Sequence, residues 1–348
     1  MRLTGPEATL SRPGRPTVTV SGGSTIAWSM PHHDAYWGVH PIVPTPFRDD
    51  GRVDLDSVDR LVDGMVATGV QGIALLGFMG EAHKLATAER RDVLRAAVER
   101  AAGRLSIWVG IRGLGTAACI DQAQEAESLG ADAIFVAPIP PQSDAALERH
   151  FRAVAASTSL PMALHDYPAS FGINLSVDLI GRLARDGVAP YIKAEDPPVI
   201  GKQRRVLAAA DGRIGVFGGL GGAWLYEELE AGAAGVMTGL AFPEVLVEIV
   251  ARFAAGDRAG AAAVFDRALP VIRYEFQPGI GVALRKHVYR RRGIFAGEHV
   301  RAPASPVDAA TLAGFEAVVE RCGLRIDAPG WTRPPVEAPV PASRPPRA

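Results

Sequence analysis

Short apolar runs alternate with amphipathic stretches along most of the chain. Each apolar run is bounded by glycine or proline, which is typical of a buried strand, and each amphipathic stretch repeats its apolar residues at helical spacing. The predicted strands are 39–47, 72–76, 105–111, 133–137, 161–164, 188–192, 214–217 and 235–238. The predicted helices are 55–66 closed by Gly69, 87–102 with Thr87 as N-cap, 116–129, 145–156, 176–184, 199–210, one that ends at 231, and 244–255.

This regular alternation predicts an α/β protein with a parallel sheet. Eight strand–helix units of this size close naturally into a (β/α)8 TIM barrel. The main alternative is an open doubly wound sheet, which usually carries an early GxGxxG motif, and the early glycine-flanked stretch 77–81 lacks that form. Residues 258–292 and 308–322 predict further helices outside the barrel, which could serve in an oligomer.

The ends of the chain differ in composition from its middle. The first residues are rich in Ser, Thr, Gly, Pro and Arg, and the last are dominated by Pro, Ala and Arg. Residues 17–20 could form an isolated strand, and Met30 could be the true start. We therefore expect a disordered extension at 1–35, the barrel at 36–256, a C-terminal helical region at 257–326 and a disordered Pro-rich tail at 327–348.

Composition and charge exclude several classes of function. Of the 348 residues, 48% are hydrophobic and 22% charged, as in a soluble globular protein, and a net charge of −1 gives no reason to expect nucleic-acid or membrane partners. No apolar run approaches the roughly 20 residues of a membrane span. The two cysteines, Cys119 and Cys322, are far apart, which fits a reducing, cytoplasmic location. No metal-ligand cluster is apparent, and we expect neither a metal nor a cofactor.

One lysine stands out from this background. The chain has four lysines, and Lys193 ends an apolar strand that Pro197 and Pro198 then stop. Burial disfavours an ammonium group, and a neutral amine can form a Schiff base with a carbonyl. The alternative is a structural ion pair with Glu195 or Asp196.

In a TIM barrel, function lies at the carboxyl ends of the strands. The unusual polar and glycine-rich segments all fall there, which favours a catalytic Lys193 over an ion pair alone. These segments are 44–46, 77–81, 165–167, 193–195 and 218–222.

Many short motifs then match, in order, those of a known family. They include Gly38–Phe47, Val53–Leu55, Gly77-x-x-Gly80-Glu81, Leu85, Glu89-Arg90, Gly130–Asp132, Ala137-Pro138, His150-Phe151, Pro161, Pro168, Gly172, Ile192-Lys193 and Gly232–Gly235. Over roughly residues 36–325 the chain resembles the dihydrodipicolinate synthase / N-acetylneuraminate lyase family of Schiff-base aldolases.

The resemblance implies that Lys193 forms an imine with pyruvate or another 2-oxo acid, and that the protonated imine stabilises a carbanion at the neighbouring carbon. It also implies that the loop beginning at Gly77 binds substrate and that the backbone N–H groups of Phe78, Met79 and Gly80 hold its carboxylate, since oriented N–H groups bind anions. A homotetramer or homodimer is implied as well. Gly218 begins the glycine-rich stretch 218–222, which could hold a phosphate, as loops after the seventh strand of a barrel often do, whereas the resemblance implies that it shapes the pocket wall.

Departures from the family pattern narrow the range of functions that the resemblance implies. The usual pair of Thr or Ser residues is Phe78-Met79 here, and the usual tyrosine pair falls on Ile139-Pro140. The family's proton-relay tyrosine falls on His165. The arginine that binds the second substrate of dihydrodipicolinate synthases falls on Ser170, which argues against that role.

Three residues could replace the lost relay. His165 is the first candidate, because an imidazole titrates near neutral pH, and its alternative is a structural histidine bonded to Asp166 or a backbone carbonyl. Tyr167 should point the same way two residues later, and Glu195 should share the face of Lys193. Glu195 could act as an acid/base or simply pair with the lysine. We expect Glu81 to be a structural carboxylate that caps loop N–H groups, and His83 and Lys84 to be solvated.

The sequence thus predicts a lyase or aldolase that acts on a 2-oxo acid through Lys193. A dehydratase of a 2-keto-3-deoxy sugar acid, using the same lysine, is the nearest alternative. The missing hydroxyl groups also leave open a barrel that binds a small molecule without catalysis.

Overall fold

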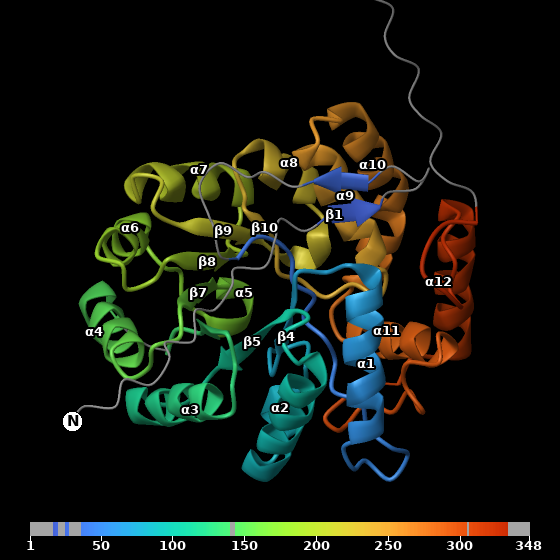
Figure 1. Ribbon diagram of the computed structural model, residues 1–348, viewed down its shortest axis with the longest axis horizontal. Coiled ribbons are helices and arrows are strands. Elements are labelled where there is room, and N and C mark those ends of the chain that lie inside the picture. Colours follow the sequence, from blue (N-terminus) through green and yellow to red (C-terminus); the bar gives the residue numbers. More distant parts are fainter. Residues whose placement is uncertain (1–16, 20–24, 28–35, 140–142, 305, 333–348) are drawn as a thin grey trace, which may run out of the picture.

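The computed structural model describes residues 17–19, 25–27, 36–139, 143–304 and 306–332. Within them, eight parallel strands form one sheet in the order β3-β10-β9-β8-β7-β6-β5-β4 (Figure 1). The strands are β3 Gly38–Val39, β4 Gly72–Leu75, β5 Ser106–Ile111, β6 Ala133–Val136, β7 Met162–Asp166, β8 Tyr191–Ala194, β9 Gly215–Gly218 and β10 Gly235–Val236. The sheet closes where Ile42 bridges Ala74 and the Val43 N–H donates to the Ala74 carbonyl at 3.1 Å. The predicted (β/α)8 TIM barrel is confirmed.

Helices surround the barrel in the predicted alternation (Figure 1). Serine and aspartate N-caps fix several starts, because the side chains of Asp54, Ser143 and Ser176 each accept a backbone N–H three residues on. The helices are α1 Leu55–Thr68, α2 Thr87–Ala101, α3 Thr116–Ser128, α4 Asp144–Ala155, α5 Pro168–Phe171, α6 Val177–Arg185, α7 Val199–Ala209, α8 Leu225–Glu230 and α9 Pro243–Ala254, with 3-10 turns at Ala82–Lys84 and Leu220–Gly222.

Three local predictions need correction. The strand expected at 39–47 keeps ladder bonds only at its start, because three prolines follow within it and a proline cannot donate to a ladder. The N-cap of α2 is Ala86 rather than Thr87, and the Ala86 N–H donates to Glu89 Oε2 at 2.9 Å. The short helix α5 was not predicted.

Further helices follow the barrel, and α10 (Arg258–Glu275) packs on α9. The stretch expected as helical over 258–292 is two helices, since Pro278-Gly279 separates α10 from α11 (Gly281–Arg291). The last helix is α12 (Ala309–Cys322). No helix among the described residues is long and apolar enough to span a membrane.

The chain ends are described only in part. Two short strands, β1 (Thr17–Thr19) and β2 (Thr25–Ala27), pair antiparallel. Residues 327–332, at the start of the expected tail, are held in place: the Trp331 Nε1–H donates to Glu248 Oε2 at 2.9 Å, and the Thr332 N–H donates to the Gly323 carbonyl at 2.7 Å. The other residues of the expected extension and tail, with Met30 and Pro140, lie outside the described residues.

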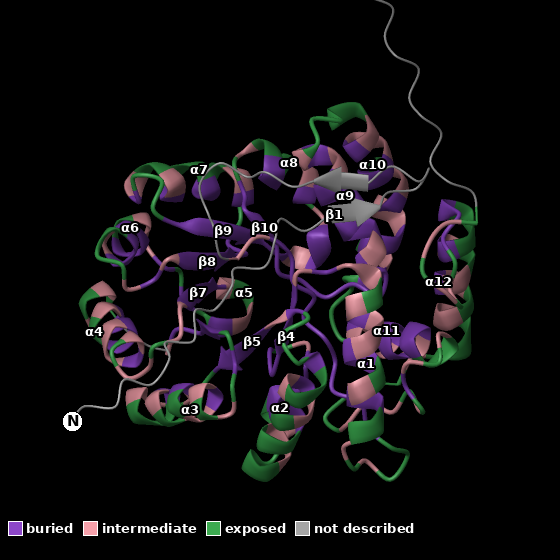
Figure 2. Cartoon of the chain, viewed as in Figure 1, coloured by how far each residue is buried: buried purple, intermediate pink, exposed green. Residues whose placement is uncertain are grey.

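Side-chain alternation along the strands decides what fills the barrel. The interior is packed by a separate hydrophobic cluster of Ile42, Ala74, Trp108, Ala133, Phe135, Ala163, Tyr191, Phe217 and Met237. In Figure 2 the strands are buried, whereas the surrounding helices expose their outer sides. Lys193 lies two residues beyond Tyr191, and His165 two beyond Ala163, so both share the inward face at the carboxyl ends of their strands.

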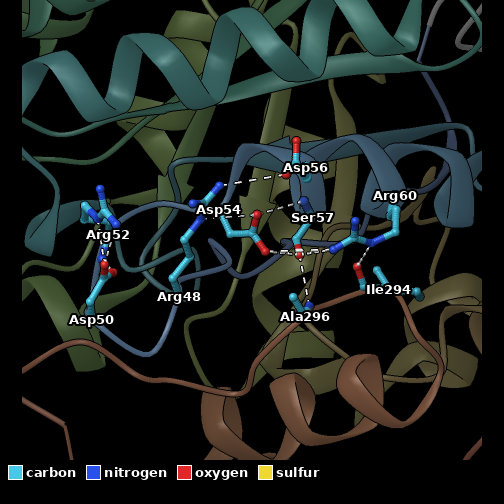
Figure 3. A network of polar contacts seen from close by, with 9 residues as sticks. All are labelled: Arg48, Asp50, Arg52, Asp54, Asp56, Ser57, Arg60, Ile294 and Ala296. Atoms are coloured by element: carbon cyan, nitrogen blue, oxygen red, sulfur yellow. Dashed lines mark hydrogen bonds and ion pairs between the residues drawn. The ribbon is translucent and has the colours of Figure 1, made fainter.

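The segment after α11 is tied back to the first helix of the barrel (Figure 3). The Ser57 hydroxyl, near the start of α1, donates to Asp54 Oδ2 at 2.5 Å and accepts the Ala296 N–H at 3.1 Å. Arg60 donates to that hydroxyl at 2.6 Å and to the Ile294 carbonyl at 2.9 Å. The described C-terminal residues are thus in direct polar contact with the barrel.

Candidate active site

Three buried polar side chains meet at the top of β7 and β8. Lys193 and His165 are register partners across these strands, and Lys193 Nζ lies 3.2 Å from His165 Nε2. Lys193 also donates to Glu195 Oε2, and the same oxygen lies 3.1 Å from His165 Nε2. The structure therefore brings together the lysine, histidine and glutamate that the sequence singled out.

Tyr167 lies beside this cluster. Its ring is stacked on that of His165 with centroids 6.2 Å apart, and Lys193 Nζ is 5.7 Å from the centre of the Tyr167 ring. His165 and Tyr167 therefore share one side, as expected from strand alternation. The phenol faces the imidazole ring to ring. Among the described residues, no direct hydrogen bond joins Tyr167 to His165 or Lys193 and could carry a proton between them.

Burial sets the protonation states in the cluster. It lowers the pKa of the Lys193 amine to about 7, against an opposing effect of the Glu228 carboxyl. It also lowers the pKa of His165 well below its ordinary value, and the nearby cations of Lys193 and Arg112 add to this effect. The imidazole is therefore neutral near pH 7, contrary to the expectation that it titrates there. In this state it can accept a hydrogen bond from Lys193.

Glu195 is held firmly in position. Its Oε1 accepts the Leu220 N–H at 2.8 Å, and its own N–H donates to the Asp166 carbonyl at 2.9 Å. Gly219 makes room for it, because a Cβ at that position would overlap the Glu195 side chain. One carboxylate oxygen is thus committed to the loop after β9, and the other faces both the amine and the imidazole.

The nearby aspartates are committed elsewhere. Lys202 on α7 lies 2.7 Å from Asp166 Oδ2 and 2.7 Å from Asp196 Oδ2. Asp196 is therefore not the partner of Lys193, and Asp166 does not bond His165. Of the structural ion pairs considered for Lys193, only the contact with Glu195 is present among the described residues.

Sequence reasoning did not single out Glu228 on α8. The carboxyl is fully buried, and neither oxygen makes a hydrogen bond of good geometry to any described residue. Burial raises the pKa of Glu228 to about 8, although the Gly219 N–H and Lys193 oppose this. Gly218 lies against it, since a Cβ there would overlap the carboxyl. Nothing in the sequence distinguishes this glutamate from its exposed neighbour Glu227, so only the fold could reveal it.

The raised pKa of Glu228 predicts a pH-dependent stability. Between pH about 4.5 and 8 the Glu228 carboxyl keeps its proton in the folded protein but has lost it in the unfolded chain. The contribution of Glu228 to the free energy of unfolding is therefore complete below pH 4.5 and is lost as the pH rises to about 8. Relative to Glu228→Gln, the wild type should become less stable across that range, by at most about 1.4 kcal/mol per pH unit.

Urea unfolding at several pH values checks this expectation. The matched control is Glu227→Gln on the exposed side of the same helix. Lys193 titrates in the same range and interacts with the Glu228 carboxyl, so all three proteins are compared in a Lys193→Met background. A stability difference between wild type and Glu228→Gln that stays constant with pH would contradict the buried, protonated carboxyl.

The glycine-flanked loop after β4 is folded on itself. The Gly80 N–H donates to the Gly77 carbonyl at 3.1 Å, and the Thr45 hydroxyl donates to the Gly80 carbonyl at 2.7 Å. The N–H groups of Phe78 and Met79 donate to no other group in the part of the chain that the structure describes. Two of the three N–H groups expected to face an anion are thus available, and that of Gly80 is used within the turn.

The carboxylate of Glu81 holds this loop in place. Its carboxylate lies 2.9 Å from Lys84 Nζ and 2.5 Å from Lys286 Nζ, and it accepts the Arg301 N–H at 3.2 Å. The expected structural role fits these contacts, but the main partners are two ammonium groups rather than the N–H groups of its own loop. Lys84 is correspondingly buried and not solvated as expected.

A small pocket with a cavity volume of about 60 Å³, partly open to solvent, adjoins the cluster. Its wall includes Gly77, Phe78, His83, Arg112, His165 and Phe171. His83 is exposed, as expected, and it also lines this pocket and stacks on Phe78 with centroids 5.2 Å apart. The lining residue His165 carries Nε2 3.2 Å from the Lys193 amine, whereas Lys193 itself is buried and is not among the described lining residues. Arg112 was not singled out from the sequence, although its place directly after a strand could have indicated it.

Comparison with known proteins adds to this geometry. The model of the dihydrodipicolinate synthetase family matches residues 35–322. The chain is 30% identical to L-2-keto-3-deoxyarabonate dehydratase of Azospirillum brasilense, covering 84% of this chain and 96% of the relative. It is 34% identical to 4-hydroxy-tetrahydrodipicolinate synthase 1 of Streptomyces coelicolor, covering 78% and 90%. The crystal structure of YagE from Escherichia coli K12 in complex with pyruvate superimposes with a TM-score of 0.78 at 28% identity, covering 83% and 99%.

Proposed function

We propose that this chain, which belongs to the dihydrodipicolinate synthetase family, is a lyase that binds a 2-oxo acid as an imine on Lys193. The observation that carries the proposal is the buried amine itself. It lies at the carboxyl end of β8 with a pKa lowered to about 7, in contact with one carboxylate and one neutral imidazole. A sizeable fraction of the amine is therefore neutral at physiological pH, as a nucleophile requires.

The chemistry follows from that amine. Neutral Lys193 attacks the keto carbon of the substrate, and loss of water leaves a protonated imine. The imine withdraws electrons, so a proton or a carbon substituent can leave the adjacent carbon as an enamine forms. Reprotonation or elimination then completes the reaction, and hydrolysis of the imine returns Lys193. The N–H groups of Phe78 and Met79 are suited to hold the substrate carboxylate near the amine.

Glu195 is the group best placed to move the proton. Its Oε2 touches both Lys193 and His165, while Oε1 is fixed by the Leu220 N–H. Neutral His165 would accept a hydrogen bond from the amine and so keep it oriented. We assign the acid/base role to Glu195, the positioning role to His165, and a wall of the site to Tyr167. Gly218 and Gly219 contribute by leaving space for the two glutamates behind them.

Either an aldolase or a dehydratase reaction would use these groups, because both pass through the same enamine. The dehydratase of a 2-keto-3-deoxy sugar acid among the relatives supports elimination of water as one outcome. Ser170 stands where the resemblance places the carboxylate-binding arginine of dihydrodipicolinate synthases, so we do not propose that synthesis, although several relatives carry that name. We further propose a cytoplasmic homotetramer or homodimer without a cofactor.

Borohydride reduction in the presence of pyruvate, read by peptide mass spectrometry, tests the proposal. We expect an irreversible pyruvyl adduct on Lys193 and on none of the other three lysines. Absence of an adduct with pyruvate and with larger 2-oxo acids would favour the alternative, a barrel that binds a small molecule without catalysis. The lost hydroxyl groups at Phe78 and Met79 are the observation behind that alternative.

A further inference from the structure

Arg112 is a cation in the pocket wall without an anionic partner. It directly follows β5, and its backbone is fixed on both sides by Gln122, which accepts the Arg112 N–H at 3.0 Å and donates to its carbonyl at 3.2 Å. The guanidinium lies 5.1 Å from the centre of the Phe171 ring and 6.0 Å from that of Phe78. No carboxylate of the described chain pairs with it.

The described pocket wall carries two guanidinium groups and no carboxylate. Arg90 lines it together with Arg112, and no Asp or Glu stands among the described lining residues. His83 adds no fixed positive charge, because burial lowers the pKa of its imidazole. Arg90 lies 3.3 Å from Gln122 Oε1 and is partly buried. A guanidinium held between two aromatic rings keeps its orientation while its hydrogen-bond donors stay open, and its planar fork matches a carboxylate.

Arg112 is connected to the amine through Phe171 and His165. The His165 ring packs edge-to-face on Phe171 with centroids 4.9 Å apart, and His165 Nε2 is 3.2 Å from Lys193 Nζ. A chain of contacts thus runs from the amine over His165 and Phe171 to the guanidinium. A substrate joined to Lys193 by its second carbon, with its first carboxylate on the loop of Phe78, can extend its other end along this path.

We propose that Arg112 determines specificity by binding a second anionic group at the far end of the substrate. The substrate class is then a 2-oxo acid that carries a further carboxylate, separated from the keto carbon by a short chain. This inference rests on the proposed function, because it places the keto carbon at Lys193. It concerns recognition only and adds no chemical step.

The test compares probes of similar length that differ in terminal charge. Borohydride trapping on Lys193 is titrated with 2-oxoglutarate, with 2-oxohexanoate and with pyruvate. We expect the half-saturating concentration of 2-oxoglutarate to lie about 10- to 100-fold below that of 2-oxohexanoate, the range of one hydrogen-bonded charge pair. In Arg112→Met this preference should disappear while pyruvate trapping falls far less than 2-oxoglutarate trapping, and Arg112→Lys should keep part of the preference.

Arg95→Met, an exposed change on the neighbouring helix α2, is the matched control and should leave all three titrations unchanged. A wild-type protein that does not prefer 2-oxoglutarate overturns the proposal. An Arg112→Met protein that loses pyruvate and 2-oxoglutarate trapping equally also overturns it, because Arg112 would then serve the shared carboxylate or the fold.

A second measurement separates this inference from the proposed function. Thermal stabilisation by 2-oxoglutarate and 2-oxohexanoate is compared in Lys193→Met, which cannot form an imine. Stronger stabilisation by the dianion, abolished in the double variant with Arg112→Met, supports the anion site even where no adduct forms. Equal stabilisation by both probes counts against Arg112, whatever the trapping shows.

Discussion

Replacing Lys193 with arginine should lower kcat/KM by about four orders of magnitude or more, the scale seen when a covalent nucleophile is removed. A guanidinium stays protonated at any working pH, so it keeps the positive charge beside Glu195 but cannot attack a carbonyl. Borohydride should then leave no adduct. The measurement is turnover of the 2-oxo acid that trapping identifies, together with peptide mass spectrometry of the reduced protein.

The chain offers a close control for this change. Lys202→Arg keeps the cation between Asp166 and Asp196 and should leave trapping on Lys193 intact. In the wild type, the initial rate of adduct formation should rise with pH through about 7 and then level off, because the neutral amine is the nucleophile. A rate that continues to rise toward pH 10 would show an amine that burial does not perturb, contrary to its place in the fold.

Glu195→Gln should lower kcat by about 10²- to 10⁴-fold, the usual contribution of a general acid–base group. The variant keeps the size of the side chain and its acceptor for the Leu220 N–H, but it cannot take up a proton from the substrate. Because Lys193 remains, borohydride should still trap the imine. The pH profile of trapping should move to lower pH, since the amine loses an anionic neighbour.

His165→Asn is the informative comparison for Glu195. The imidazole is neutral and contacts the amine, so its loss should disturb the position of Lys193 and cost less than the loss of the carboxylate. Steady-state kinetics of both single variants and of the double variant separate the two roles. A large loss in His165→Asn beside a nearly active Glu195→Gln would reverse the assignment and return the proton transfer to the histidine.

Features of the fold that follow from the spacing of apolar residues could be predicted from the sequence. The alternation of apolar and amphipathic stretches predicts the barrel, and the two-residue repeat of a strand puts Lys193 on its inward face. The position of His165 beside it follows from parallel neighbouring strands. Its protonation could not be predicted, because the pKa depends on burial and on Arg112, which approaches from another strand end.

Contacts between distant segments were beyond such reasoning. Glu228 lies on a helix whose pattern shows only an ordinary polar position, and it becomes special because the backbone of Gly218 leaves it room beneath the site. Similarly, Glu81 meets Lys286 and Arg301 from more than 200 positions further along the chain. The first strand is shorter than predicted for a different reason. Its apolar residues favour a strand, but its prolines cannot donate to the hydrogen-bond ladder.

The contacts of Glu81 join the barrel and the helices that follow it into one structural unit. The barrel is topologically complete at β10 and α9, yet the glycine-flanked loop 77–81 is held by Lys286 and Arg301, which come after α9 in the sequence. Ala296 is bonded in the same way to the Ser57 hydroxyl of the first helix (Figure 3). Residues 286–301 therefore act as a clasp on the end of the barrel that carries Lys193. Recombination that exchanged barrels between relatives would have to carry this clasp along with its matching loop.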